Sequence, residues 1–242
     1  MSKKISVESP SVADMLEAGM HFGHRTSKWH PKMKPYIFEA RKGIHIINLD
    51  ISREKFQTAL DFISQSVAQG KNILLVGTKQ QVKQKIQELA EEVGMPYVNQ
   101  RWLGGTLTNF NVIKNSIRTF RDLTEDQAAG KLEKYTKKEQ LQFNRKITKL
   151  SKLVGGLSTL NRVPDIIFIW DIKQEKTALT EAKKRGLPIV AICDTNVNPD
   201  GIDYIIPGND DASKTVDLVL AAIKGAIKEA GQRKEEEIKD KE

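Results

Sequence analysis

Histidine and aspartate, the side chains that bind metal ions or exchange protons, gather toward opposite ends of this 242-residue sequence. All four histidines lie near the N-terminus, at positions 21, 24, 30 and 45. Toward the C-terminus, Asp194 closes one expected strand, and Asp210 and Asp211 follow the next. Carboxylates at adjacent strand ends can converge on a divalent cation, with a histidine completing the set. Aspartates also cap helices, and capping of the final helix by Asp210 or Asp211 is the simpler explanation of their spacing.

The segment 20–42 combines positive charge with aromatic side chains. It carries six Lys or Arg residues and a single acid, Glu39. Pro31 and Pro35 prevent a continuous helix, so we expect an irregular basic loop. Cations beside stacking surfaces suit phosphates and unpaired bases together, whereas the alternative is a solvated loop with a packed Trp. The candidate RNA-binding residues in this segment are Arg25, Lys28, Trp29, Lys32 and Lys34.

The motif 101–109, RWLGGTLTN, follows an expected strand at the end where α/β proteins place ligands. Its two glycines allow close backbone approach, and its Arg and Trp offer charge and a stacking face. The motif leads into a basic stretch, since residues 101–154 hold twelve Lys or Arg and five Asp or Glu. It therefore suits a small-molecule site and an RNA-facing joint equally well. The candidate RNA-binding residues here are Arg101, Trp102, Asn109 and Lys114.

Motifs of nucleotide-binding and hydrolytic enzymes are missing from the sequence. Val76-Gly77-Thr78-Lys79 follows an expected strand, as a phosphate-binding loop would, but neither GxxxxGK[ST] nor GxGxxG occurs. No GxSxG nucleophile motif is present, and Cys193 lies in an apolar run typical of a core residue. We therefore expect no catalysis. The competing hypothesis is a nucleotide-dependent transferase, which would require nucleotide binding that is lost on changing Gly77 or Lys79.

The overall composition, 39% hydrophobic and 29% charged with a net charge of +8, is typical of a soluble globular protein. A single cysteine cannot form an internal disulfide, which fits a reducing compartment. The N-terminal Met-Ser-Lys-Lys lacks the apolar core of a secretory signal, so we expect a cytoplasmic protein. No apolar run approaches the roughly 20 residues that span a bilayer, so we expect no membrane partner.

Short apolar runs rich in Ile and Val alternate with amphipathic stretches, the pattern of an α/β domain with a parallel sheet. The expected strands are 72–76, 96–99, 165–170, 188–193 and 203–206. The expected helices are 52–68, 79–92, 174–185 and 212–230, and the first three end close to a glycine. A small β-hairpin is expected where 36–40 pairs with 44–48 across Arg41-Lys42-Gly43.

Some sixty-five residues separate the strands expected at 96–99 and 165–170, far more than a crossover needs. Apolar residues from Phe110 to Phe120 and from Phe143 to Leu157 recur three and four positions apart, which predicts two helices with narrow apolar seams. We expect an antiparallel coiled-coil hairpin over 107–160 that projects from the sheet. Ordinary bundle helices, whose apolar stripes are broader, are the alternative. The chain is thus expected to be one α/β domain over 1–230 with a mobile charged tail over 231–242.

Six motifs occur in a fixed order: Ala18–His24, Trp29–Met33, Gly43–Leu49, Val76–Lys79, Arg101–Asn109, and Asp194–Asn196 with Pro207–Ala212. Together they closely resemble the bacterial form of the second small-subunit ribosomal protein, over about residues 10–230. The resemblance implies a flavodoxin-like or Rossmann-like parallel sheet of about five strands with an inserted coiled-coil hairpin, and no catalysis. It also implies a structural role in the small ribosomal subunit, with ribosomal RNA and other ribosomal proteins as partners and no small-molecule substrate.

The same resemblance implies that the protein helps to dock the large, messenger-binding ribosomal protein one. It implies no required cofactor but a zinc site between the globular part and the hairpin region, with the matching positions His24, Asp194, Asp210 and Asp211. In the mechanism that we expect, basic side chains of segment 20–42 and of the hairpin neutralise phosphates, while Trp29 and Trp102 pack against ribose or bases. A protein-docking adaptor whose charge is incidental is a third hypothesis.

Overall fold

The computed structural model describes the backbone of residues 7–239 and the side chains of residues 7–233. Its centre is a five-stranded parallel sheet in the order β5-β4-β6-β7-β8. Counted along the chain from β4, this is the order 2-1-3-4-5 of flavodoxin-like folds, so the predicted fold class is confirmed. The strands are β4 Ile73–Val76, β5 Tyr97–Val98, β6 Ile166–Ile169, β7 Ile189–Cys193 and β8 Tyr204–Pro207, all within one residue or two of the predicted ranges.

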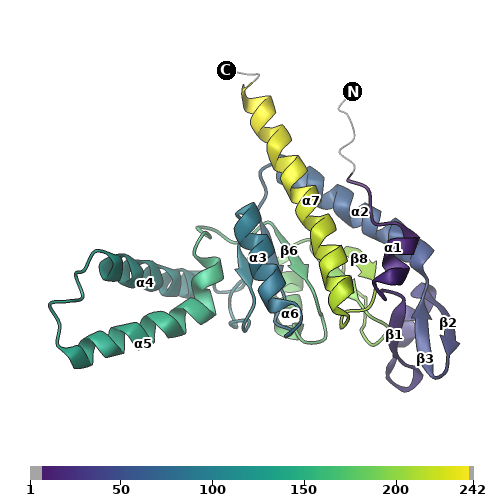
Figure 1. The fold of residues 1–242 in the computed structure, drawn as a ribbon, viewed down its shortest axis with the longest axis horizontal. Coiled ribbons are helices and arrows are strands. Elements are labelled where there is room, and N and C mark those ends of the chain that lie inside the picture. The colour runs from purple at the N-terminus through teal and green to yellow at the C-terminus, as the bar shows by residue number, and fades with distance from the viewer. Residues whose placement is uncertain (1–6, 240–242) are drawn as a thin grey trace.

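Alternate side chains of each strand enter two separate cores, which is why these strands are apolar at every position. Ile73 and Leu75 pack with α2, α3 and α7, whereas Leu74 and Val76 pack on the opposite face with α6. The helices are α2 Leu49–Ala68, α3 Lys83–Val93, α6 Lys176–Arg185 and α7 Ser213–Lys239. Figure 1 shows α7 running across the sheet beside α2.

Three helices differ from the predicted ranges by three residues or more at one end. Helix α2 begins at Leu49 rather than at residue 52, because the side chain of Asn48 caps it by accepting from the amides of Asp50 and Ile51. Helix α3 begins at Lys83 rather than at residue 79, because residues 79–82 first form a turn closed by the Val82 amide on the Lys79 carbonyl. Helix α7 continues to Lys239 rather than ending at residue 230, since good helix formers follow Gly231 and Arg233 pairs with Glu229 one turn earlier. Most of the expected tail is therefore helical. Its mobility stays a prediction, and residues 240–242 lie outside the described part.

The N-terminal segment forms a second, three-stranded antiparallel sheet in the order β1-β3-β2, which corrects the prediction of an irregular loop over 20–42. It follows the short helix α1 Val12–Glu17 and consists of β1 Phe22–Arg25, β2 Ile37–Arg41 and β3 Ile44–Ile47. The predicted hairpin is β2–β3, turning at Lys42 and Gly43 with φ of 50° and 77°. Strand β1 was not predicted because it pairs with β3 across two short 3₁₀ turns, Thr26–Lys28 and Pro31–Tyr36.

The inserted segment forms two helices, α4 Phe110–Ala128 and α5 Lys137–Val154, that extend side by side away from the sheet (Figure 1). They run antiparallel, since Gln127 bonds Asn144 near the tip and Arg121 bonds the Ser158 carbonyl near the base. Ile113 and Ile117 are buried at the base, whereas the seam becomes half-exposed toward the tip. Supercoiling of the pair stays a prediction.

Within residues 7–239, no helix combines the length and the apolarity that a membrane crossing needs.

Candidate metal centre and nucleic-acid interface

Strand β1 is fixed over the carboxyl end of β7, and this contact positions His24. The amide of His24 donates to Thr195 Oγ1 at 2.8 Å, and the amide of His30 donates to the Thr195 carbonyl at 2.7 Å. Gly23 makes the approach possible, because a Cβ at that position would lie 2.6 Å from a Thr195 carbon. Thr195 directly follows Asp194, so the contact brings the His24 ring to the Asp194 carboxylate.

His24 lies between two of the predicted aspartates. Its Nδ1 is 3.0 Å from Asp194 Oδ2, and its Nε2 is 3.7 Å from Asp211 Oδ2. Asp194 is 1% exposed, and its other oxygen accepts from the Thr195 hydroxyl at 3.0 Å. His24, Asp194 and Asp210 each offer a ligand atom, and the three atoms lie within 4.8 Å of one another. The structure therefore brings together residues that are 170 and more positions apart in the sequence.

The loop after β8 is held by its asparagine rather than by its aspartates. Asn209 Oδ1 accepts from the amides of Asp211 and Ala212, and Asn209 Nδ2 donates to the Gly19 carbonyl. Among the described residues, neither Asp210 nor Asp211 accepts a hydrogen bond from a backbone amide through its side chain. The capping interpretation of the two aspartates is therefore wrong, because both carboxylates turn toward His24 and Lys79.

Lys79 completes the cluster from the end of β4. Its Nζ lies 3.1 Å from Asp171 Oδ2, 2.9 Å from Asp210 Oδ1 and 2.8 Å from Asp211 Oδ1. This position, between the carboxyl ends of β4 and β6, is the point where the strand order reverses and where flavodoxin-like folds bind phosphate-bearing ligands. Here an ammonium group of the chain itself occupies that point, held by three carboxylates.

Burial and mutual repulsion govern protonation in this cluster. Burial raises the pKa of Asp210 to about 7, and the nearby carboxylates of Asp194 and Asp171 add to the effect. The hydrogen bond to Asp194 raises the pKa of His24 above its ordinary value. Burial alone would lower the pKa of Lys79, but the carboxylates of Asp210, Asp211 and Asp171 outweigh it and raise that pKa.

The donor set of the cluster fits a divalent metal ion such as zinc, which takes imidazole nitrogen and carboxylate oxygen. Asp210 Oδ1 is buried and accepts no well-aligned hydrogen bond, its contact with Lys79 being an ion pair. An open pocket of about 290 Å³ leads to His24, Asp194 and Asp211. The expected position of the site needs correction, however. It lies beside the small sheet β1-β3-β2, because His24 is on β1, and not beside α4 and α5, which extend from the other end of the molecule (Figure 1).

The candidate RNA-binding residues of the N-terminal segment differ in exposure and in their contacts with other described residues. Arg25, Lys28 and Lys34 are exposed, and the first two border the same pocket as His24. Lys32 is exposed but forms an ion pair with Asp200. Trp29 is half-buried, with its ring centre 5.0 Å from that of His45. Arg25, Lys28 and Lys34, which form no ion pair with another residue in the described part of the chain, are thus the strongest candidates in this segment.

The motif 101–109 forms a tight turn between β5 and α4 in which Arg101, Asn109 and, one turn later, Lys114 are exposed. The prediction that Trp102 binds RNA is wrong. Trp102 is 8% exposed and donates from Nε1 to Glu181 at 3.0 Å, so its ring belongs to the core and is not available to stack on a base. Glu181 was not predicted as a functional residue. Its only sequence signal is a Glu on the apolar side of α6, between Ala178 and Ala182.

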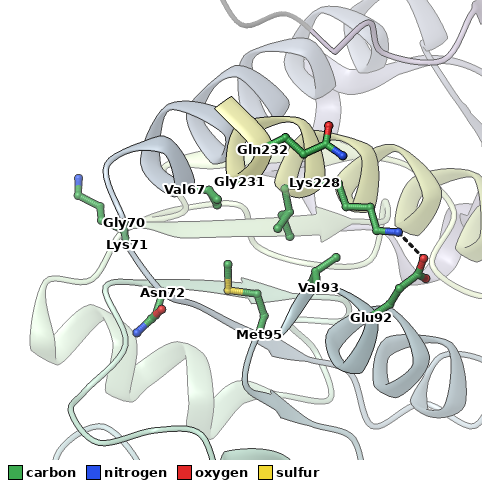
Figure 2. Close-up of a pocket in the computed structure, with 11 residues that line it drawn as sticks. Val67, Gly70, Lys71, Asn72, Glu92, Val93, Met95, Lys228, Gly231 and Gln232 are labelled. Carbon is green, nitrogen blue, oxygen red and sulfur yellow. Dashed lines mark hydrogen bonds and ion pairs between the residues drawn. The ribbon is translucent and has the colours of Figure 1, made fainter. Parts of the chain in front are cut away.

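Two other features with ligand-binding potential do not form a reactive site. Gly77 is required by packing, because a Cβ there would lie 2.5 Å from Ile86 and 2.8 Å from Val82, so it is no evidence for a phosphate loop. A pocket of about 570 Å³ lies at the amino ends of β4 and β5, between α2, α3 and α7. Its lining combines apolar side chains such as Val67, Val93 and Met95 with polar ones, among them the ion pair of Lys228 with Glu92 (Figure 2).

Fold and site together define the class of the protein. It is a flavodoxin-like α/β protein in which charged side chains of the chain itself occupy the carboxyl ends of the strands, with exposed cations outside this cluster. The chain matches the family model described as "Ribosomal protein S2" over residues 15–230. It is 48% identical over 222 residues to the "Small ribosomal subunit protein uS2" of Geotalea uraniireducens (strain Rf4), an alignment that covers 92% of this chain and 87% of that protein. The chain therefore belongs to the ribosomal protein S2 family, and the predicted resemblance is confirmed.

Proposed function

We propose that this protein is a structural, non-catalytic constituent of the small ribosomal subunit in the cytoplasm, where it binds ribosomal RNA beside other ribosomal proteins. The observation that carries the proposal is the family match over residues 15–230. The charge distribution supports it, because exposed cations gather on the small N-terminal sheet and on the α4–α5 pair, at opposite ends of the molecule (Figure 1). A rigid α/β body between two basic ends can hold RNA at two places.

Binding would be electrostatic and positional. Arg25, Lys28 and Lys34 would neutralise phosphates and release counterions, as would Arg101 and Lys114 at the base of the helical pair. Asn109, which is exposed beside them, would add polar contacts to ribose or phosphate, and Trp29 would pack against the RNA with the part of its ring left open. None of these steps requires a chemical reaction.

The salt dependence of RNA affinity tests this mechanism. Replacing Arg25, Lys28 and Lys34 together by Gln should flatten the log–log salt slope of binding to small-subunit ribosomal RNA by roughly 0.7–0.9 per lost phosphate contact. The matched control replaces Arg53, Lys55 and Lys71, which are equally exposed but lie on or just after α2, outside both basic regions. An equal change of slope in the two triple variants would contradict the assignment.

We also propose that the cluster at the carboxyl edge of the sheet binds zinc. His24, Asp194, Asp210 and Asp211 would hold the ion, which would tie β1 to the ends of β7 and β8 and so fix the basic N-terminal sheet on the body. Asp210 Oδ1 supports this proposal, because it is buried and its contact with Lys79 is an ion pair without the alignment of a hydrogen bond.

Equilibrium dialysis of the full chain against zinc, after treatment with a chelator, tests the metal proposal. We expect one bound ion and its loss in the Asp194→Asn variant. Asp203→Asn is the matched control, because Asp203 is also an aspartate beside a strand but bonds the Ile189 amide at the other edge of the sheet. A protein known to bind zinc, dialysed in parallel, shows that the assay detects the bound ion. Absence of bound zinc in the wild type under those conditions would overturn the proposal.

A role in docking ribosomal protein one is proposed at the small sheet. Phe22 on β1 and Phe38 on β2 are 49% and 70% exposed, and Ile44, on the strand β3 that lies between them in the sheet, is 37% exposed. Exposed apolar side chains on neighbouring strands of one small sheet are typical of protein interfaces. Pull-down of ribosomal protein one after ribonuclease treatment should succeed with the wild type and fail with the Phe22→Ala, Phe38→Ala double variant. Equal recovery with both proteins would place docking elsewhere.

A further inference from the structure

Glu181 on α6 is a buried carboxylate that accepts five hydrogen bonds from a single turn of the chain. Its Oε1 accepts from Trp102 Nε1 at 3.0 Å and from the Gly105 amide at 2.8 Å. Its Oε2 accepts from the Leu107 amide at 2.9 Å and from both the amide and the hydroxyl of Thr108 at 3.1 Å. With 7% exposure, the carboxylate is almost completely removed from water.

Such an arrangement stabilises an anion inside the protein. Burial alone would raise the pKa of Glu181, but the hydrogen bonds from Trp102, Gly105, Leu107 and Thr108 outweigh burial and keep that pKa below its ordinary value. Removing the acceptor would leave several donors buried without a partner, which is the costly way to lose a hydrogen bond. The turn is therefore held in its conformation by one side chain from another element.

Two further contacts act on the same turn. Arg185, one helical turn after Glu181, donates from Nε to the Leu107 carbonyl at 2.7 Å. Gly105 has φ of 91°, a left-handed conformation that residues with a Cβ rarely adopt. Helix α6 thus fixes the turn from outside while the glycine permits its shape. The bond from Arg185 is separate from the backbone pairing of β4 with β5, so the turn is held by α6 in addition to the sheet.

We propose that Glu181 is a positioning residue for RNA binding, acting through the turn 102–108. Arg101 precedes this turn and Asn109 follows it, and both side chains are exposed. Because Glu181 holds the turn, the backbone that carries these two side chains and the first turn of α4 is ordered before RNA binds. Without it, the turn must be ordered at the moment of binding, which weakens association. This inference rests on the proposed RNA-binding function.

The test compares Glu181→Gln with the wild type in the full chain, using small-subunit ribosomal RNA as the probe. Gln keeps the shape but replaces one acceptor oxygen with a donor group. We expect faster hydrogen exchange at the amides of Gly105, Leu107 and Thr108, and RNA affinity reduced by about tenfold, as for the ordering of one or two side chains on binding. The salt slope should not change, because no cation is removed.

Glu175→Gln is the matched control. Glu175 is 4% exposed at the start of the same helix and accepts from the Thr78 hydroxyl, so its replacement removes a buried carboxylate without touching the turn. It should retain wild-type RNA affinity. Should Glu181→Gln fail to fold, Gly105→Ala perturbs the turn from its other side, and the same loss of affinity at unchanged slope is expected.

The outcomes separate this inference from the function beneath it. If the wild type does not bind ribosomal RNA, the proposed function fails. Suppose instead that the wild type binds RNA and that Glu181→Gln shows faster exchange in the turn but binds RNA equally well. The proposed function then stands, and the positioning role of Glu181 is overturned. Equal losses of affinity in Glu181→Gln and Glu175→Gln would likewise overturn it, because they would indicate general destabilisation.

Discussion

At the scale of single residues, the sequence indicated which side chains carry chemistry but not how they are paired. His24, Asp194, Asp210 and Asp211 were identified through the family resemblance, and the structure places them together. Lys79 was considered only as part of a phosphate loop, whereas it is the central cation of the cluster. Its role depends on contacts with residues more than 90 positions away, which local patterns cannot reveal.

Replacing Lys79 by Met should strongly destabilise the protein without metal. The change leaves the buried carboxylates of Asp171 and Asp210 without their cation, and breaking a buried pair in this way costs about 3–5 kcal/mol. Lys85→Met is the matched control, because its partner Asp217 is largely exposed and such surface pairs contribute about 1 kcal/mol or less. Urea unfolding of both variants measures the difference. Similar losses would contradict the view that Lys79 holds the cluster together.

Glu181 gives a prediction about pH. Because its pKa in the folded protein is lowered from about 4.5, its stabilisation is complete above that value and is lost as the pH falls through the lower, folded-state pKa. The difference in unfolding free energy between the wild type and Glu181→Gln should therefore shrink between about pH 6 and about pH 3. Denaturant titrations at the two pH values measure it. A difference independent of pH would mean that the carboxylate is not the stabilising group.

At the scale of elements, burial on both faces made the five parallel strands predictable, because Ile166–Ile169 and Ile189–Cys193 are apolar at each position. The seams of α4 and α5 were equally visible in the spacing of their apolar residues. Strand β1 was not, since its residues Phe22–Arg25 are largely open and their pairing with Ile44 and Ile46 is not local. The buried place of Trp102 also depended on a distant partner, Glu181.

The α4–α5 pair should be anchored at its base and looser toward its tip. Ile117 is 2% exposed within the core beneath the sheet, so Ile117→Ala should cost about 2–5 kcal/mol of global stability. Ile147→Ala removes the same atoms from a half-exposed position farther along the pair and should cost about 1 kcal/mol or less. Thermal unfolding compares the two variants. Equal costs would show that the whole seam is one cooperative core.

At the scale of the whole molecule, the chain consists of a central body and two extensions. The parallel sheet with its helices forms the body, and the small sheet and the α4–α5 pair extend from opposite ends of it (Figure 1). The net charge of +8 is carried largely by these two extensions, since segments 20–42 and 101–154 both have a clear excess of Lys and Arg. This division was predictable from charge and periodicity, whereas the relative placement of the two extensions required the sheet topology.

In the function that we propose, this charge distribution holds the protein on ribosomal RNA of the small subunit. Sucrose-gradient sedimentation of cell extracts containing the tagged wild type or the Arg25, Lys28 and Lys34 triple Gln variant tests it most directly. We expect the wild type to migrate with small subunits and to be released by high salt or ribonuclease. We expect the triple variant to be released at lower salt. Migration of the wild type with free protein at low salt, in extracts with intact subunits, would contradict it.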